Sequence, residues 1–338
     1  MASKISIYGL SGSGKSCYIY AMTKAMNKGI KFDNGKVMTM VNSDLKQVNL
    51  LNQRFNMMVN GMWPPGTTET TVFSYNNRIA FKFITDISIL DYRGGIFTNI
   101  EEDMNEVDDL YKSFKDSGSL AFFIGVDKVM RALKGDVEAF NDLDLMNNLY
   151  ARYLDLYPND TTPIIFVLTK ADLASPEELE TCKNFIRDNY AAFFGAGTGL
   201  TVGLTAVTLG RNLGCGADNE LIGELRVGPS EGNIQIPILF TIFGIYSKRI
   251  AEELERNAAY NKTLETRQGT LAQREQKGFF SKIWYGGTSS IKRQIEAIQG
   301  QIKKSNEDLL LMADCIDLIK SKMRDGVELY VDGELQNI

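Results

Sequence analysis

The sequence predicts a mixed α/β protein with a mostly parallel sheet, one antiparallel edge hairpin, helices on both faces of the sheet, and a C-terminal α-helical hairpin or coiled coil. Three observations predict this class. Short apolar runs of buried-strand type alternate with helical stretches, which is typical of parallel sheets. Glycine-, threonine- and aspartate-containing turns follow the ends of these runs. A heptad spacing of apolar residues dominates the C-terminal part.

The elements follow one another in an α/β order. Residues 79–84 and 86–91 are expected to form the antiparallel edge hairpin, and the other strands are expected to be parallel and buried. The expected strands are 4–8, 79–84, 86–91, 119–126, 163–169 and 199–207. The expected helices are 15–28, 100–116, 128–156 and 175–194.

Composition excludes several classes of protein. With 338 residues, 44% hydrophobic and 23% charged, the chain has the composition of a folded globular protein. The absence of histidine excludes Ser-His and Cys-His mechanisms. The net charge of −5 gives no indication of nucleic-acid binding. Four widely spaced cysteines and an N-terminus that reads as a strand favour a cytoplasmic location.

The first motif is GLSGSGKS at residues 9–16, between an apolar strand and a helix. This is the spacing of a P-loop, whose glycines let backbone N–H groups surround a phosphate. The lysine of such a loop reaches the β- and γ-phosphates and its serine binds Mg²⁺. The expected nucleotide-binding residues here are Gly9, Ser11, Gly12, Ser13, Gly14, Lys15, Ser16 and Cys17.

Two later strand ends complete a nucleotide site. Asp91 ends an apolar strand and opens a D-x-x-G turn, so it is expected to hold Mg²⁺ while the N–H of Gly94 meets the γ-phosphate. Thr169, Lys170 and Asp172 follow another strand, and the Asp172 carboxylate can accept two hydrogen bonds from guanine but not from adenine. A backbone N–H from Thr205 and Ala206 is expected at the guanine oxygen.

In this order the motifs resemble those of translation-factor-class (Ras-like) P-loop GTPases, over roughly residues 1–245. The strings WPPGT and DYRGG also resemble, loosely, bacterial GTPases of conflict and defence systems. The resemblance implies GTP or GDP and Mg²⁺ as ligands. It also implies a switch threonine, for which Thr67 and Thr68 both qualify and Thr68 is preferred, so that the expected metal ligands are Ser16, Thr68 and Asp91.

The sequence departs from this family at two places. The segment before the switch threonine is long and contains a helical stretch at 43–59, which either covers the core or forms a lid. Gly95 stands where Ras-like enzymes carry a water-orienting glutamine, so hydrolysis is expected to be slow. The catalytic group stays unassigned, with Arg93, the backbone at Gly95, Arg54 and a partner's residue as candidates.

The chain is expected to divide into a nucleotide-binding domain at 1–235, a helical arm at 236–326 and a tail at 327–338. Residues 210–232 are expected to be a loop. The arm is expected to pair with itself as an antiparallel hairpin or with a second chain as a dimer. Its heptad stripe consists of Ile291, Ile295, Ile298, Ile302, Ser305, Leu309, Met312, Ile316, Ile319 and Met323.

The expected function is a GTP-binding switch with slow Mg²⁺-dependent hydrolysis that signals to an unidentified protein through its switch loops or arm. One alternative is a dynamin-like mechanical GTPase, because the aromatic residues at 279–285 suit a membrane interface, a partner pocket or a contact within the chain. A second is a scaffold that holds GTP or GDP without hydrolysis. An ATPase is least favoured, because Asp172 would then have no role.

Overall fold

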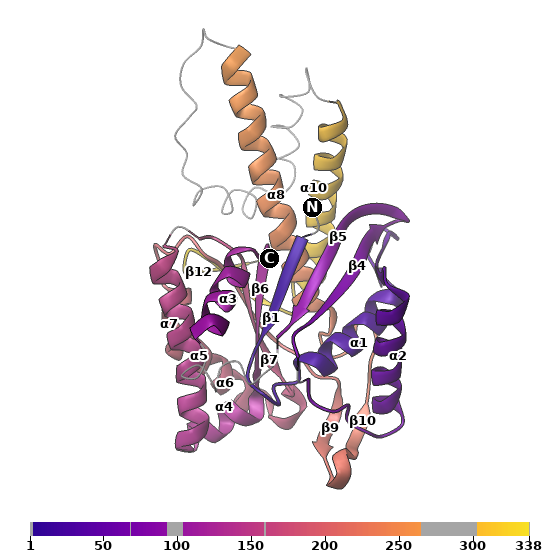
Figure 1. Cartoon of the computed structure of the whole chain (residues 1–338), viewed down its shortest axis with the longest axis vertical. Coiled ribbons are helices and arrows are strands. Elements are labelled where there is room, and N and C mark those ends of the chain that lie inside the picture. Colours follow the sequence, from indigo (N-terminus) through magenta and orange to yellow (C-terminus); the bar gives the residue numbers. More distant parts are fainter. Residues whose placement is uncertain (1–2, 68, 93–103, 159, 265–302, 338) are drawn as a thin grey trace.

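A twisted sheet forms the centre of the molecule. The computed structural model describes residues 3–67, 69–92, 104–158, 160–264 and 303–337. Within these residues a 10-stranded sheet has the order β12-β11-β8-β7-β6-β1-β5-β4-β3-β2 (Figure 1). Its strands are β1 (Ser3–Tyr8), β2 (Ile30–Lys31), β3 (Val37–Asn42), β4 (Thr71–Ile79), β5 (Lys82–Asp91), β6 (Ser119–Gly125), β7 (Ile164–Thr169), β8 (Thr201–Ala206), β11 (Glu328–Val331) and β12 (Glu334–Gln336).

The central strands β5, β1, β6, β7 and β8 are mutually parallel, as the sequence predicts. Antiparallel strands extend the sheet on both sides, with β4, β3 and β2 beyond β5, and β11 and β12 beyond β8. The carboxyl ends of the parallel strands therefore lie along one edge, which is where ligands bind in open α/β sheets.

Helices cover both faces of the sheet. Side chains alternate between the two faces along each strand, so Ile5 and Ile7 join one core while Tyr8 joins the other. Helices α1, α2, α8 and α10 pack on the first face, and α3 to α7 on the second. Their bounds are α1 (Lys15–Lys28), α2 (Leu45–Val59), α3 (Met104–Lys115), α4 (Val126–Leu133), α5 (Val137–Leu156), α6 (Pro176–Asn189), α7 (Ala191–Phe194), α8 (Gln235–Leu264) and α10 (Lys303–Met323).

The predicted hairpin begins earlier than expected and does not lie at an edge of the sheet, because β3 pairs with β4 and β2 lies beyond β3. Residues 71–79 form β4 and residues 82–91 form the single strand β5, so the prediction of a turn near Thr85 was wrong. The turn lies at Ala80 and Phe81, both with positive φ. Polar Asn77 belongs to the strand because its side chain is buried and donates to Tyr246 Oη over 2.6 Å.

Two long predicted helices are interrupted. The stretch 128–156 divides into α4 and α5, because Gly135 has a φ of 87° and the Asp136 side chain accepts from the N–H of Ala139 at the start of α5. The stretch 175–194 divides into α6 and α7. The stretch 43–59 is helix α2, whose Leu51 and Met58 are buried in the core, so this helix covers core and forms no lid.

The predicted loop at 210–232 contains a second, two-stranded sheet. Strands β9 (Gly210–Cys215) and β10 (Leu221–Leu225) pair antiparallel. Residues that tolerate positive φ permit the turns, among them Asn212, Asp218 and Asn219. Because these residues and the glycines interrupt the apolar pattern, the sequence concealed the hairpin.

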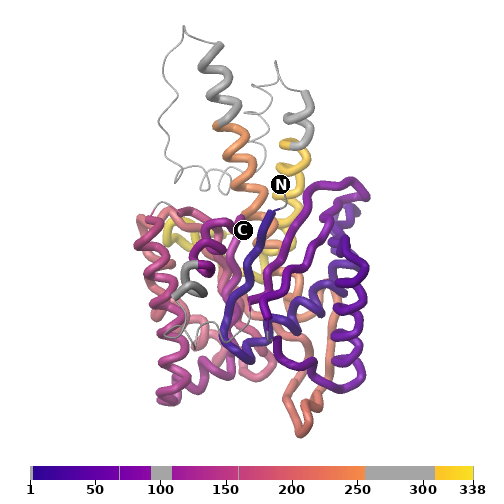
Figure 2. Tube along the Cα trace, viewed as in Figure 1, coloured from indigo at the N-terminus to yellow at the C-terminus, as the bar shows by residue number. Residues whose placement is uncertain are grey.

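The arm is more closely joined to the sheet than predicted. Residues 234–247 are all buried, since the first half of α8 packs on the sheet, and the predicted boundary after residue 235 therefore falls inside the core. Helix α10 returns along α8 within the same chain, and Figure 2 shows the pair leaving the sheet opposite the β9–β10 hairpin. Of the heptad stripe, Leu309, Ile316, Ile319 and Met323 are buried.

The C-terminal residues also differ from expectation. The predicted tail at 327–338 contains β11 and β12, because Leu329 and Val331 are buried against the first core. The aromatic segment at 279–285 lies outside the described residues. None of the described helices is both apolar enough and long enough to cross a membrane.

Candidate nucleotide-binding site

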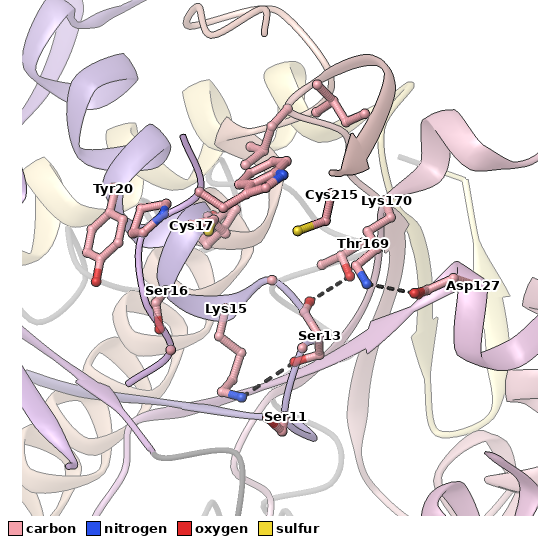
Figure 3. A pocket seen from close by; sticks show the side chains of 18 of the residues that line it. Ser11, Ser13, Lys15, Ser16, Cys17, Tyr20, Asp127, Thr169, Lys170 and Cys215 are labelled. Atoms are coloured by element: carbon pink, nitrogen blue, oxygen red, sulfur yellow. Dashed lines mark hydrogen bonds and ion pairs between the residues drawn. The ribbon is translucent and has the colours of Figure 1, made fainter. Parts of the chain in front are cut away.

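A cavity of about 560 Å³ lies at the carboxyl edge of the sheet (Figure 3). Its walls come from the predicted P-loop, from residues 63–67, from residues 169–173 after β7, and from the β9–β10 hairpin. This volume lies within the range of small-molecule sites. Two separated predicted motifs, the P-loop and the T-K-x-D sequence, therefore meet in one cavity.

The P-loop has a backbone that only glycine suits. Gly9 has a φ of 151°, and a Cβ there would lie 2.2 Å from the carbonyl oxygen of Phe123. Gly12 and Gly14 have φ values of 73° and 80°. Gly14 caps α1 without a side-chain hydrogen bond, so no side chain occupies the amides at this helix N-terminus. Such amides attract anions.

Lys15 is buried beside this loop, with 6% of its surface exposed. Its ammonium donates to the carbonyl oxygens of Gly9 over 2.7 Å and Leu10 over 3.0 Å. Loss of hydration lowers the pKa of Lys15 to about 8, and the charge of Asp91 opposes this shift. A phosphate would supply the negative charge that the buried ammonium lacks.

Ser16 joins three segments of the site. Its hydroxyl donates to Asp91 Oδ2 over 2.6 Å and lies 2.6 Å from the hydroxyl of Thr67. Thr67 is thus the threonine that the structure places at Ser16, whereas the preferred candidate Thr68 lies outside the described residues.

Asp91 is 1% exposed, and its second oxygen, Oδ1, has no hydrogen-bond partner. Burial raises the pKa of Asp91, although the hydrogen bond from Ser16 and the charge of Lys15 oppose the shift. An unpartnered buried carboxylate oxygen beside two hydroxyls fits Mg²⁺, which binds through few carboxylates together with phosphate oxygens and water. The described residues contain no group of three or more His, Cys, Asp and Glu side chains that would form a different metal site.

The opposite end of the cavity carries the T-K-x-D sequence. Thr169 donates to the carbonyl oxygen of Ser13 over 2.7 Å and so ties this sequence to the P-loop. Lys170, at a φ of 56°, forms an ion pair with Asp127 over 2.7 Å, as Figure 3 shows. Asp172 accepts from the Thr208 hydroxyl over 2.8 Å and from the Leu213 N–H over 2.7 Å.

Some predicted residues lie elsewhere. Thr205 is 1% exposed and donates to the carbonyl oxygen of Gly326, and neither it nor Ala206 is among the described residues that line the cavity. Val207 and Leu209, just beyond the end of β8, line it instead. Burial raises the pKa of Tyr20 to about 12, and the charge of Arg54 on α2 opposes this shift, but Arg54 does not line the cavity. Arg93, Gly94 and Gly95 fall outside the described residues.

Sequence reasoning missed several lining residues, namely Tyr20, Trp63, Tyr92, Asp127 and Leu213. Asp127 follows an apolar strand, and this position could have indicated it. Tyr20 lies one helical turn after Ser16 and Tyr92 directly follows Asp91, so their places beside predicted motifs could have indicated them. Trp63 and Leu213 have no local signal, because long-range contacts bring them to the site.

Fold and site together define an α/β P-loop protein with the motif order of Ras-like GTPases. No family profile matches the chain, and no curated protein matches it. The solved structures to which it is similar include two translation elongation factors and a small COPII coat GTPase. One is the translation elongation factor SelB from Methanococcus maripaludis, with 11% identity over 61% of this chain and 30% of that one at a TM-score of 0.31.

A second is the bacterial selenocysteine-specific elongation factor EF-Sec, with 12% identity over 61% of this chain and 25% of that one at a TM-score of 0.29. A third is the small COPII coat GTPase SAR1 from Encephalitozoon cuniculi, with 15% identity over 79% and 84% of the two chains at a TM-score of 0.28. This chain thus aligns with less than a third of the two elongation factors. At these scores the likeness supports no functional conclusion, and the chain's own motifs and topology support the class.

Proposed function

We propose that this protein binds GTP and GDP with Mg²⁺ and hydrolyses GTP slowly as a molecular switch. One observation carries the proposal. A single cavity has Lys15 and Ser16 at its P-loop end and the carboxylate of Asp172 at the other, and Ser16 donates a hydrogen bond to the buried carboxylate of Asp91 behind it. Phosphates and Mg²⁺ suit the first end, and a base with two adjacent N–H donors suits the second.

In this proposal each end of the site has its own task. The P-loop amides and Lys15 hold the β- and γ-phosphates, while Ser16, Asp91 and a switch threonine hold Mg²⁺, which neutralises phosphate charge. Thr67 is the better candidate for that threonine because of its contact with Ser16. Asp172 then accepts hydrogen bonds from guanine N1–H and N2–H₂.

Slow turnover and switching form the finer part of the proposal. Gly95 supplies no side chain to orient an attacking water, so we expect slow hydrolysis by the isolated protein. Loss of the γ-phosphate would release the segment that carries Thr67. A partner protein would read this change through the switch loops or through α8 and α10. The four free cysteines favour a reducing compartment such as the cytosol.

The test is a substitution of Asp172 that should change which nucleobase the protein prefers. Asp172→Asn should weaken GDP binding about 100-fold or more, because an N–H₂ donor replaces one of the two acceptor oxygens, and should favour xanthosine diphosphate. Calorimetry with GDP, xanthosine diphosphate and ADP measures the three affinities. Asp188→Asn, on the exposed part of α6, is the matched control and should change none of them. Unchanged selectivity in Asp172→Asn would contradict the assignment of the base site.

A further inference from the structure

The β9–β10 hairpin contacts the base end of the cavity. The N–H of Leu213, on β9, donates to Asp172 Oδ2 over 2.7 Å. The Thr208 hydroxyl, just before β9, donates to Asp172 Oδ1 over 2.8 Å. These two hydrogen bonds fix how the carboxylate faces the cavity. Each of its oxygens still has a lone pair that can accept a further hydrogen bond. The position of the hairpin and the orientation of Asp172 are therefore linked.

The same hairpin holds the segment that leads to Thr67. The indole Nε1 of Trp63 donates to the carbonyl oxygen of Gly214 over 2.7 Å. The backbone N–H of Trp63 donates to the Asn219 oxygen over 2.8 Å, and Leu221 N–H donates to the Gly61 oxygen over 2.8 Å. Leu213 and Gly214 are adjacent, so Asp172 and Trp63 bind neighbouring residues of one strand.

The connection from Trp63 to the phosphate end is short and stiff. Pro64 and Pro65 follow Trp63, and their rings restrict φ. Only Gly66 separates them from Thr67, whose hydroxyl lies 2.6 Å from that of Ser16. A shift of Trp63 therefore moves the segment that places Thr67.

We propose that Trp63 is a positioning residue which couples recognition of the base at Asp172 to the placement of Thr67 at Ser16, with the β9–β10 hairpin as the connecting element. The inference rests on the proposed function, since it takes guanine as the base and Mg²⁺ as the ion. A base that engages Asp172 fully holds Leu213, Gly214 and Trp63 in this arrangement. The Thr67 hydroxyl then lies beside that of Ser16, so the ligands of the proposed Mg²⁺ site are in place.

Such a coupling is reciprocal. If a base that donates both hydrogen bonds to Asp172 favours Mg²⁺ binding, then Mg²⁺ must increase the preference for that base over one with a single donor by the same factor. Inosine triphosphate is the matched probe, because it lacks only the 2-amino group that donates to Asp172. The preference for GTP over ITP should therefore be larger with Mg²⁺ than without it.

The experiment measures four affinities by calorimetry, for GTP and ITP with Mg²⁺ and with EDTA. In the wild-type protein we expect Mg²⁺ to raise the GTP-to-ITP affinity ratio about twofold to tenfold, which is the range of one intramolecular hydrogen bond. Trp63→Phe keeps an aromatic ring and removes the N–H that donates to the carbonyl oxygen of Gly214. In this variant Mg²⁺ should change the ratio clearly less than in the wild-type protein, because only the two backbone hydrogen bonds between residues 61–63 and the hairpin remain.

Trp284→Phe changes the other of the 2 tryptophans and should leave the wild-type ratios intact. A general loss of stability in Trp63→Phe would lower all four affinities together but would not reduce the dependence of their ratio on Mg²⁺. If the wild-type ratio ignores Mg²⁺, or if Trp63→Phe keeps the full dependence, the coupling is wrong while guanine binding stands. If neither nucleotide binds the wild-type protein, the coupling and the proposed function both fail.

Discussion

The hydroxyl of Ser16 donates to Asp91 Oδ2 over 2.6 Å and so joins the start of α1 to the end of β5. Strands β1 and β5 are parallel neighbours, with Ile7 opposite Asp91, and this register brings the end of β5 beside the P-loop. The pair therefore results from strand order rather than from proximity in the sequence.

Lys15→Ala should weaken GTP binding about 100-fold or more, because a buried ammonium contributes charge-assisted hydrogen bonds to phosphate. Calorimetry measures the loss. Lys24→Ala is the matched control on the same helix, since Lys24 bonds Asn52 and does not line the cavity. Circular dichroism should show that both variants fold. Undiminished GTP binding in Lys15→Ala would remove the P-loop assignment.

Asp91→Asn should stabilise the nucleotide-free protein but weaken the effect of Mg²⁺ on GTP binding. Because burial raises the Asp91 pKa, the folded protein binds that proton more tightly than the unfolded chain, and the ionised carboxylate destabilises the nucleotide-free protein at neutral pH. Removing the charge should raise the free energy of unfolding by about 1 kcal/mol. Urea denaturation measures this change.

The same substitution should abolish the strengthening of GTP binding by Mg²⁺, because a neutral amide replaces the one carboxylate at the proposed metal site. Calorimetry with Mg²⁺ and with EDTA measures this loss. Full Mg²⁺ dependence in Asp91→Asn would show that the ion binds elsewhere.

GTP affinity should fall as pH rises through the pKa of Lys15. This pKa is about 8 in the nucleotide-free protein, below its ordinary 10.5, and bound phosphate would raise it again by favouring the charged form. The protonated lysine fraction then makes binding about fourfold weaker at pH 8.5 than at pH 7, a range in which guanine N1 stays protonated. Calorimetry at the two values is the measurement, and equal affinities would mean that Lys15 does not bind the phosphates in its charged form.

Gly203→Ala should test the packing of α8 on the sheet. A Cβ at Gly203 would lie 2.8 Å from the Phe240 ring, so we expect a loss of about 1–3 kcal/mol in the free energy of unfolding. Gly195→Ala is the control, because its Cβ would meet the nearest atom, the Ala191 oxygen, only at 3.5 Å. Denaturation of both variants gives the comparison. Equal stability would mean that α8 is less firmly seated than the structure shows.

The central fold could be predicted because buried parallel strands carry uninterrupted apolar runs, as in β6 and β7. The antiparallel additions could not be predicted in the same way. In β4 the polar residues Asn76 and Asn77 conceal the strand, and the amide nitrogen of Asn77 donates to Tyr246, which is 169 residues away. Strands β9 and β10 are short and rich in glycine, so their pairing depends on tertiary contacts with residues 61–63.

The site shows the same division. The P-loop, Asp91 and Asp172 could be found because local chemistry fixes their residue types and spacing. Trp63 and Leu213 could not, since each acts through a hydrogen bond to a residue distant in the sequence. The predicted base contact at Thr205 and Ala206 lies just before the cavity in the sequence, because β8 ends at Ala206 and the cavity wall begins at Val207.

The most direct test of guanine nucleotide binding is calorimetry on folded, nucleotide-stripped protein with GDP, GTP and ATP in the presence of Mg²⁺. We predict one site per chain, with both guanine nucleotides bound at least about 100-fold more tightly than ATP, because Asp172 accepts from donors that adenine lacks. Failure to bind either GDP or GTP, or equal affinity for ATP, would contradict the account.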